Sequence, residues 1–146
     1  MNKKEYEEWV VKAEEALQSS DLFKDTAHQK ILKSYNGQVG ALGISILMSG
    51  LIPTLAIYYQ HQTENNNGAC RKNVLEVIAR MMNYENARTL LETALDLDRQ
   101  KKATLDLEDN EILLNGLEKQ RKQLQDTIID CSVALKQVVR TYKLVE

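Results

Sequence analysis

The sequence predicts an all-α protein: a compact bundle of about five to seven helices that ends in a long C-terminal helix. The 146 residues include one Pro and six Gly, so residues that break helices are rare. Apolar residues recur at spacings of three and four, whereas the apolar–polar alternation typical of strands is rare. A chain of this length forms one domain, residues 1–146, and buries roughly two thirds of the surface that its unfolded form exposes.

The first helix is predicted over residues 3–19, where apolar side chains recur on one face and glutamates occupy the other. The members of the apolar face are Tyr6, Trp9, Val10, Ala13, Ala16 and Leu17. The polar run Ser19-Ser20-Asp21 ends this helix. A second helix is expected to begin at Asp25 or Thr26 and to continue to about Met48.

Residues 34–63 contain no Asp, Glu, Lys or Arg, although more than a quarter of the whole chain is charged. As one helix, residues 39–59 would be long enough to cross a bilayer, which needs about 20 mainly apolar residues. Ser49-Gly50 followed by Pro53 is instead typical of a helix that stops and restarts. The sequence therefore favours two buried helices, the second over residues 51–60.

Three glycines, Gly37, Gly40 and Gly43, are spaced by three residues within the predicted second helix. Each Gly lowers helix propensity by about 1 kcal/mol relative to Ala, so an offsetting gain is needed. We expect these glycines to let a neighbouring helix approach closely, and Gly50 and Pro53 to shape the turn that follows. They do not form a phosphate-binding loop, because such glycines follow a strand at other spacings.

The C-terminal half is predicted to contain one loop and three helices. Asn and Gly residues tolerate the left-handed backbone of a turn and mark residues 63–68 as the loop. Apolar positions at helical spacing then run from Cys70 to Met81 and from Ala87 to Leu97. The last helix carries an apolar seam from Leu107 to Tyr142, with the alternating spacings of three and four that are typical of a coiled coil.

The sequence contains none of the motifs expected at a catalytic or metal site. The histidines are His28 and His61, and neither lies in a zinc-binding or di-iron pattern. We interpret Asp25 and His28 as an acidic first turn followed by a solvated or core imidazole, and His61 as a cap at a helix C-terminus. Catalysis by lysine, tyrosine or glutamate side chains stays open, although nothing in the sequence favours it, and we expect no metal and no cofactor.

Two observations favour a cytoplasmic location. Cys70 and Cys131 lie far apart among apolar helical positions, so we expect reduced thiols in the core rather than a disulfide. The first ten residues are acidic and amphipathic, where a signal peptide would need an apolar segment.

Positive charge increases towards the C-terminus, where residues 116–146 hold six basic and four acidic side chains. On a helix with 100° per residue, four of these cations fall within a sector of roughly 80° away from the seam. They are Lys122, Lys136, Arg140 and Lys143. The simplest interpretation is a solvated face, with cations favoured near a helix C-terminus by the macrodipole. An isoelectric point near 5.8 does not indicate a free-standing nucleic-acid-binding protein.

Residues 35–59 carry the first half of a resemblance to a known family. A tyrosine, Tyr35, leads a helix that ends at a Gly50-Leu51 turn, and the short apolar run Leu55-Ala56-Ile57-Tyr58 follows. This order resembles the signature of the small helical subunit of the type III-B CRISPR effector, the Cmr complex.

The C-terminal helix carries the second half of the resemblance. The family closes on a helix with an Ala-Leu-Lys element and later basic and aromatic residues, to which Ala134-Leu135-Lys136 and Arg140-Thr141-Tyr142 are similar. Length, helical character and the order of elements agree across the chain, although the specific motifs cover about a third of it. The acidic segment Asp96–Glu118 does not match the family pattern.

The resemblance implies a structural subunit without catalysis. Members of the family stack into a filament with copies of themselves and contact the backbone subunits of the effector. They also line the channel that holds guide RNA and target RNA with basic residues. By position, Lys136 and Arg140 are the expected RNA-facing residues. The helical wheel adds Lys122 and Lys143, and an exposed turn before the signature adds Lys30 and Lys33.

Two other classes of protein remain open. One is a coiled-coil interaction protein that binds no nucleic acid and uses the seam from Leu107 to Tyr142 for a partner helix. The other is a small membrane protein with residues 39–59 inserted. Co-purifying RNA would separate the first class from an effector subunit, and extraction from a membrane fraction would separate the second.

Overall fold

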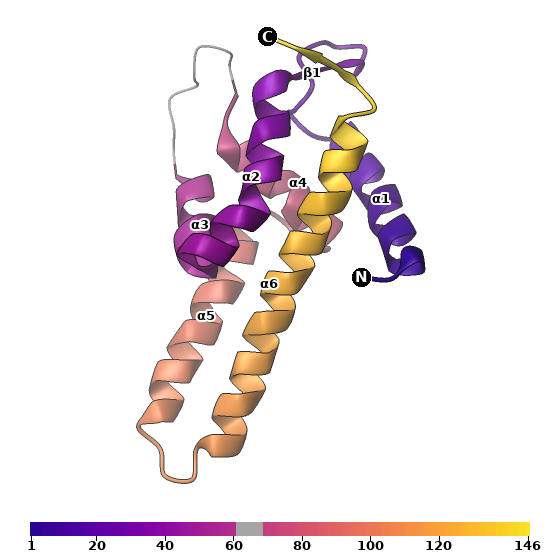
Figure 1. Cartoon of the computed structure of the whole chain (residues 1–146). Coiled ribbons are helices and arrows are strands. Elements are labelled where there is room, and N and C mark those ends of the chain that lie inside the picture. Colours follow the sequence, from indigo (N-terminus) through magenta and orange to yellow (C-terminus); the bar gives the residue numbers. More distant parts are fainter. Residues whose placement is uncertain (61–68) are drawn as a thin grey trace.

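The computed structural model describes residues 1–60 and 69–146, within which the chain forms six helices and one pair of parallel strands (Figure 1). The elements are α1 (Lys3–Gln18), β1 (Lys30–Leu32), α2 (Lys33–Ser49), α3 (Leu51–Tyr59), α4 (Arg71–Met81), α5 (Ala87–Leu105), α6 (Glu111–Val139) and β2 (Lys143–Val145). The predicted all-α fold class and long C-terminal helix are confirmed. The predicted loop at residues 63–68 and the cap at His61 lie outside the described residues.

Helix α6 is the central element of the fold. Its C-terminal half packs against α1 and α2, and its N-terminal half runs beside α5 as a hairpin that extends below the body of the molecule (Figure 1). The buried apolar positions of the predicted seam are Leu124, Ile128, Cys131, Leu135 and Val138. The seam is therefore covered by helices of the same chain. The sequence places Leu107 in the seam as well, but this residue precedes α6 and is 55% exposed.

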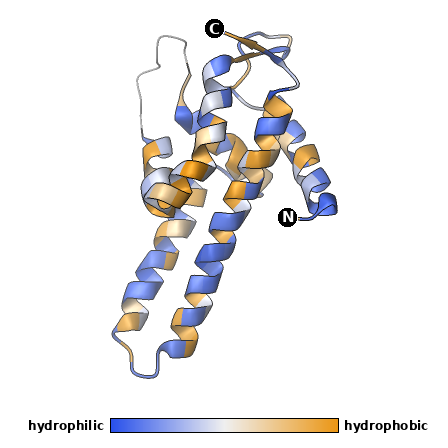
Figure 2. Ribbon diagram, viewed as in Figure 1, coloured by the Kyte–Doolittle hydropathy of each residue, from blue (hydrophilic) through white to orange (hydrophobic). Residues whose placement is uncertain are grey.

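The distal hairpin differs in character from the body. Figure 2 shows that its two helices are mostly hydrophilic, with apolar residues on narrower stripes. An ion pair between Lys101 Nζ and Glu118 Oε1, 2.8 Å apart, joins α5 to α6 within it. At the turn between them, the Asn110 side chain donates to the Thr104 carbonyl over 3.3 Å. Polar contacts and partial burial, rather than a full core, hold this part together.

The break between α2 and α3 occurs where the sequence predicts it. Gly50 has a φ of +95°, which a residue with a Cβ rarely adopts. Its N–H donates to the Ile46 carbonyl over 2.9 Å and closes α2. Pro53 lies in the first turn of α3, where its missing N–H costs nothing. Among the described residues, no helix is both long and apolar enough to cross a membrane.

The predicted start of the second helix is wrong. Instead of entering a helix, Asp25 accepts hydrogen bonds from the backbone N–H groups of Gln29 and Lys30, each at 3.0 Å. This side chain offers the backbone an alternative to helical bonding, and His28 completes the turn with a φ of +54°. β1 then pairs with β2, and α2 begins at Lys33.

The three glycines of α2 have different surroundings. A Cβ at Gly43 would meet Ser132 and Ile129 of α6 at 3.5 and 3.6 Å, which agrees with the expected approach of a neighbouring helix. A Cβ at Gly40 would lie 2.6 Å from the Nζ atom of Lys136, the flexible end of a side chain. At Gly37, apart from its chain neighbours and the nearby backbone of α2, no atom of the described residues lies within 4 Å of such a Cβ, so the expectation of close packing is wrong there.

Candidate nucleic-acid interface

The parallel strands bring cations from the two ends of the chain together. Lys30 of β1 is the register partner of Lys143 of β2, and adjacent strands lie about 4.8 Å apart. Lys33 begins α2 directly after β1, and Arg140 caps the C-terminus of α6 three residues before Lys143. The fold therefore places four of the predicted RNA-facing residues at the same end of the molecule.

A fifth cation at this end was missed by the sequence reasoning. Lys24 donates from its Nζ to the Glu146 carbonyl over 2.6 Å, and its backbone N–H donates to the Lys30 carbonyl over 2.8 Å. No sequence pattern marks Lys24, because its position follows from the turn before β1 and from the C-terminal residues. We call the set the basic end; its members are Lys24, Lys30, Lys33, Arg140 and Lys143. All five are exposed, and the described residues give none of them a salt bridge to a carboxylate side chain.

Two local devices hold the basic end in shape. The first is the turn at Asp25, where hydrogen bonds from backbone N–H groups, above all that of Lys30, lower the pKa of the carboxyl group. The second is Tyr142, whose hydroxyl contacts the side chains of Glu14 and Gln18 on α1. Burial, followed by the contact with Glu14, raises the pKa of Tyr142 to about 12. Tyr142 therefore fixes the segment that leads from Arg140 into β2.

Aromatic packing adds to this anchor. The Phe23 ring meets the Tyr142 ring edge-on, with centroids 5.1 Å apart, and stacks on His28 at 4.6 Å. The expected first helical turn at His28 is absent, and its imidazole instead covers an aromatic ring. These contacts tie the loop before β1 to the segment before β2, which carry Lys30 and Lys143.

Lys136 is placed differently from the members of the basic end. It lies one helical turn before Arg140 on α6 and is half-buried. Its stem runs along the groove between α6 and α2, so that its ammonium group lies over the bare backbone of Gly40. Lys136 is therefore next to the basic end but also forms part of a groove lined mainly by apolar side chains.

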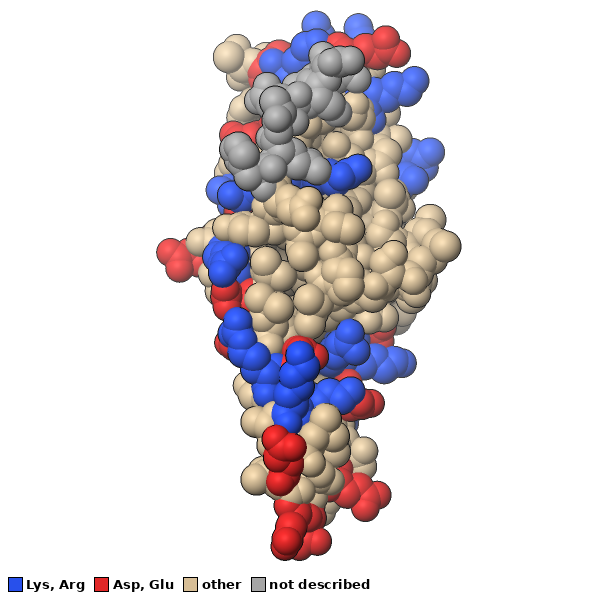
Figure 3. All heavy atoms as spheres, turned by 90° about the vertical axis from the view of Figure 1, so that its left-hand side faces the viewer, with Lys and Arg blue, Asp and Glu red and all other residues tan. Residues whose placement is uncertain are grey.

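Lys122 lies apart from the other candidates. It precedes Lys136 by 14 residues of continuous helix, which corresponds to about 21 Å. Its Nζ lies 4.0 Å from Asp126 Oδ2. The helical wheel reports the direction of a side chain around the axis, but it ignores distance along the axis. On the face drawn in Figure 3, Lys and Arg gather at the top and again lower down, and the middle of the view is largely uncharged.

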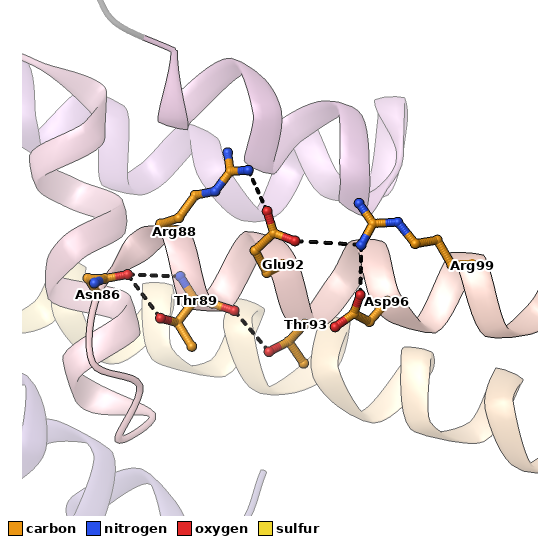
Figure 4. Close-up of polar contacts among 7 residues, drawn as sticks. All are labelled: Asn86, Arg88, Thr89, Glu92, Thr93, Asp96 and Arg99. Carbon is orange, nitrogen blue, oxygen red and sulfur yellow. Dashed lines mark hydrogen bonds and ion pairs between the residues drawn. The ribbon is translucent and has the colours of Figure 1, made fainter.

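Several cations of α5 are already paired with acidic side chains. On α5, Arg88 contacts Glu92, and Arg99 Nη1 lies 2.7 Å from Asp96 Oδ1 and 3.6 Å from Glu92 Oε2 (Figure 4). This ladder neutralises much of the positive charge on that helix. The basic end is consequently the better candidate for contacts with phosphate groups, because none of its cations forms a salt bridge with a carboxylate side chain of the described residues.

The described residues give little support to other chemistry. Within residues 1–60 and 69–146, no three His, Cys, Asp or Glu side chains are grouped so that they could hold a metal ion. Burial raises the pKa of the Cys131 thiol to about 12, so this thiol stays protonated and is a poor nucleophile.

The structure is thus that of a small, mainly helical protein with five exposed cations gathered at one end of its described residues. Comparison with known families identifies it further: residues 8–140 match the family model described as CRISPR-associated protein (Cas_Cmr5). The chain belongs to this family and is thus a subunit of the type III-B Cmr complex.

A solved structure has a similar fold. It is the X-ray crystal structure of a CRISPR-associated Cmr5 family protein from Thermus thermophilus. The two chains share 15% sequence identity and a TM-score of 0.61, and the match covers 98% of this chain and 99% of that chain. At this identity the likeness concerns the fold alone. A comparison with curated proteins gives no match.

Proposed function

We propose that this chain is a non-catalytic structural subunit that lines the channel for guide RNA and target RNA with its basic end and stacks on other copies of itself. Membership of the Cmr5 family supports a place in the Cmr complex. The observation that carries the RNA contact is the pairing of β1 with β2, which gathers five exposed cations at one end of an otherwise acidic protein.

The size of the basic end fits a subunit better than an independent RNA-binding protein. A few exposed cations form only a few phosphate contacts, and binding of this kind is weak and sensitive to salt. In an assembly with several copies, the contacts act together on one strand, so that modest contributions add to a high overall affinity. Cleavage would belong to other subunits.

The test is a salt titration of target-RNA retention by reconstituted Cmr complex. The variant Arg140→Glu/Lys143→Glu should weaken retention and reduce the salt slope by about 0.7 for each phosphate contact that the variant removes, while cleavage of bound target persists. Lys3→Glu/Lys4→Glu is the matched control, because it makes the same change in charge at exposed positions of α1. Equal affinity and equal slope for the variant, the control and the wild type would reject the RNA contact.

The alternative of a coiled-coil protein without nucleic acid loses its main support. That hypothesis offers the apolar seam to a partner helix, but from Leu124 to Val138 the apolar seam positions are buried by the chain's own helices. RNA in a native pull-down of the complex, removed by ribonuclease and dependent on the basic end, would favour the proposed function over this alternative.

A further inference from the structure

The turn between α5 and α6 carries an exposed apolar surface with acidic surroundings. Its apolar side chains are 55 to 85% exposed and are Leu105, Leu107, Ile112 and Leu113. The charged residues between them are all acidic: Asp106, Glu108, Asp109 and Glu111. We call residues 105–113 the hairpin tip. It projects from the body of the molecule, and Figure 3 shows acidic and uncharged residues at this lower end. Several large apolar side chains exposed together are typical of an interaction site.

A second exposed apolar surface lies on the body, in the groove between α2 and α6. The groove has a volume of about 200 Å³. Ile44, Leu47 and Val133 line it and are 61, 69 and 49% exposed. The described residues that line the groove include no carboxylate, and the charged one among them is Lys136, whose ammonium group lies at Gly40. The groove is therefore apolar with a cation at its side.

The two surfaces complement each other in both apolar character and charge. We infer that the hairpin tip of one copy docks in the α2–α6 groove of the next copy, with Lys136 facing the acidic residues of the tip. A second copy is the favoured occupant because one chain carries both halves of the contact: apolar residues among acids, and an apolar groove with a cation. This inference rests on the self-stacking part of the proposed function and names the surfaces involved.

The contact has a defined geometry along the molecule. Ile112 and Val133 are separated by 21 residues of the same helix, which corresponds to about 32 Å. Because the two surfaces differ, the contact is heterologous, and each copy keeps a free tip or a free groove for another copy. Repetition generates an open chain in which successive copies are displaced along α6. Lys136 then contacts protein, while the basic end stays free for RNA.

The experiment is sedimentation velocity of the full-length purified chain over a range of concentrations. Ile112→Asp disables the tip, and Val133→Asp disables the groove with an acid that also repels the tip. Each variant alone should weaken association by at least about tenfold in Kd, the equivalent of about 1.4 kcal/mol. Ile44→Asp provides a second groove variant at an exposed position. Val11→Asp, at a 56% exposed position of α1, is the matched control and should associate as the wild type does.

Mixing the two variants gives the decisive result. The Ile112→Asp chain keeps a working groove and the Val133→Asp chain keeps a working tip, so their equimolar mixture should form a dimer and nothing larger. A mixture that stays monomeric, variants that associate like the wild type, or a wild type that never associates would each overturn the inference. In the same way, Lys136→Glu should weaken association and Glu111→Lys in the same chain should restore it.

Failure of this inference is distinguishable from failure of the proposed function. Retention of target RNA by reconstituted complex reports on Arg140 and Lys143, which lie outside both docking surfaces. A monomeric wild type together with normal RNA dependence would overturn the docking and leave the RNA contact in place. Normal association without RNA dependence would do the reverse.

Discussion

Tyr142 shows how one side chain organises a surface made from distant segments. Its hydroxyl reaches Glu14 and Gln18 on α1, and its ring contacts Phe23 in the loop before β1. These contacts fix the short segment between α6 and β2, which carries Arg140 and Lys143 at its two ends. A tyrosine near the C-terminus looks from sequence like one more seam residue. Its role as an anchor depends on partners more than 100 residues away.

Replacing Tyr142 by Phe should lower the free energy of unfolding by about 1 kcal/mol, the usual net contribution of one hydrogen bond. Urea denaturation measures the change. Tyr6→Phe is the control, because the Tyr6 hydroxyl forms no hydrogen bond with the described side chains, and it should leave the midpoint unchanged. Equal midpoints for both variants would show that the Tyr142 hydroxyl does not stabilise the fold.

The raised pKa of Tyr142 also predicts a dependence on alkaline pH. The unfolded chain releases the phenol proton near 10.0, whereas the folded chain holds it to about 12. Between these values the folded state binds more protons, so stability falls as pH rises through this window. The contribution is fully present below the unfolded pKa of 10.0. Compared with the wild type, Tyr142→Phe should lose less stability between about pH 10 and about pH 12 in urea titrations.

Two glycines, one in α2 and one directly after it, should respond to replacement by alanine with stability changes of opposite sign. Gly37 is exposed, and apart from its chain neighbours and the nearby backbone of α2 no described atom lies within 4 Å of the place where a methyl group would stand, so Gly37→Ala should stabilise the helix by about 1 kcal/mol. Gly50 has a φ of +95°, and Gly50→Ala should destabilise the fold by about 1 to 3 kcal/mol through backbone strain. Thermal or urea unfolding measures both. Changes of the same sign would contradict the assigned backbone roles.

At the scale of elements, strongly periodic helices could be predicted from sequence and short long-range elements could not. The apolar spacing in α1, α4 and α6 reflects burial of one helix face, and Gly50 with Pro53 encodes a break locally. The strands β1 and β2 contain three residues each and pair across more than 100 residues, so no local pattern reveals them. The start of α2 was missed because the Asp25 side chain captures backbone N–H groups that a helix would use.

The candidate site also has a part that could be predicted from the sequence and a part that could not. The helical wheel draws attention to cations at the C-terminal end of α6, but angular position alone groups Lys122 with residues that lie at least about 21 Å away along the axis. Lys24 and the pairing of Lys30 with Lys143 follow from the parallel strands. A cationic surface that is assembled by strand pairing cannot be predicted from the residue pattern of one helix alone.

The strand pair itself can be tested by truncation. Removing residues 143–146 deletes β2 and the hydrogen bond from Lys24 to Glu146. The amide hydrogen of Ile31 should then exchange much faster, because β1 loses its strand partner, while the Lys30 amide, which donates to Asp25, and the amides of the buried half of α6 keep their protection. Arg140→Glu/Lys143→Glu is the control, since it keeps the backbone pairing. Unchanged exchange at Ile31 would show that β2 does not hold β1.

At the scale of the whole molecule, charge is divided along the long axis. One end gathers cations and the other, the hairpin tip, contains four acidic residues and no basic one. A net charge of −2 conceals this division. If the proposed RNA contact holds, this division would turn the basic end towards the polyanion and the hairpin tip away from it, without any base-specific contact.

The isolated chain should therefore bind single-stranded RNA weakly. About two to four phosphate contacts at the basic end would give a salt slope of about −0.7 for each contact, and binding should disappear near physiological salt. Fluorescence anisotropy with a labelled single strand measures this slope. A steep slope from many contacts, or binding that resists salt, would indicate an RNA surface larger than the basic end.

The hairpin of α5 and α6 has a further consequence for dynamics. In the outer part of the hairpin the two helices pack on each other. The α6 residues that precede Leu124 are at most partly buried, and Thr104 is the buried residue at the outer end of α5. Such a region can open from the tip inwards at a lower free energy than global unfolding, while the body stays folded. We therefore expect local stability to decrease from the body of the molecule to the tip of the α5–α6 hairpin. Compliance of this kind would let neighbouring subunits adjust their spacing when a bound strand bends.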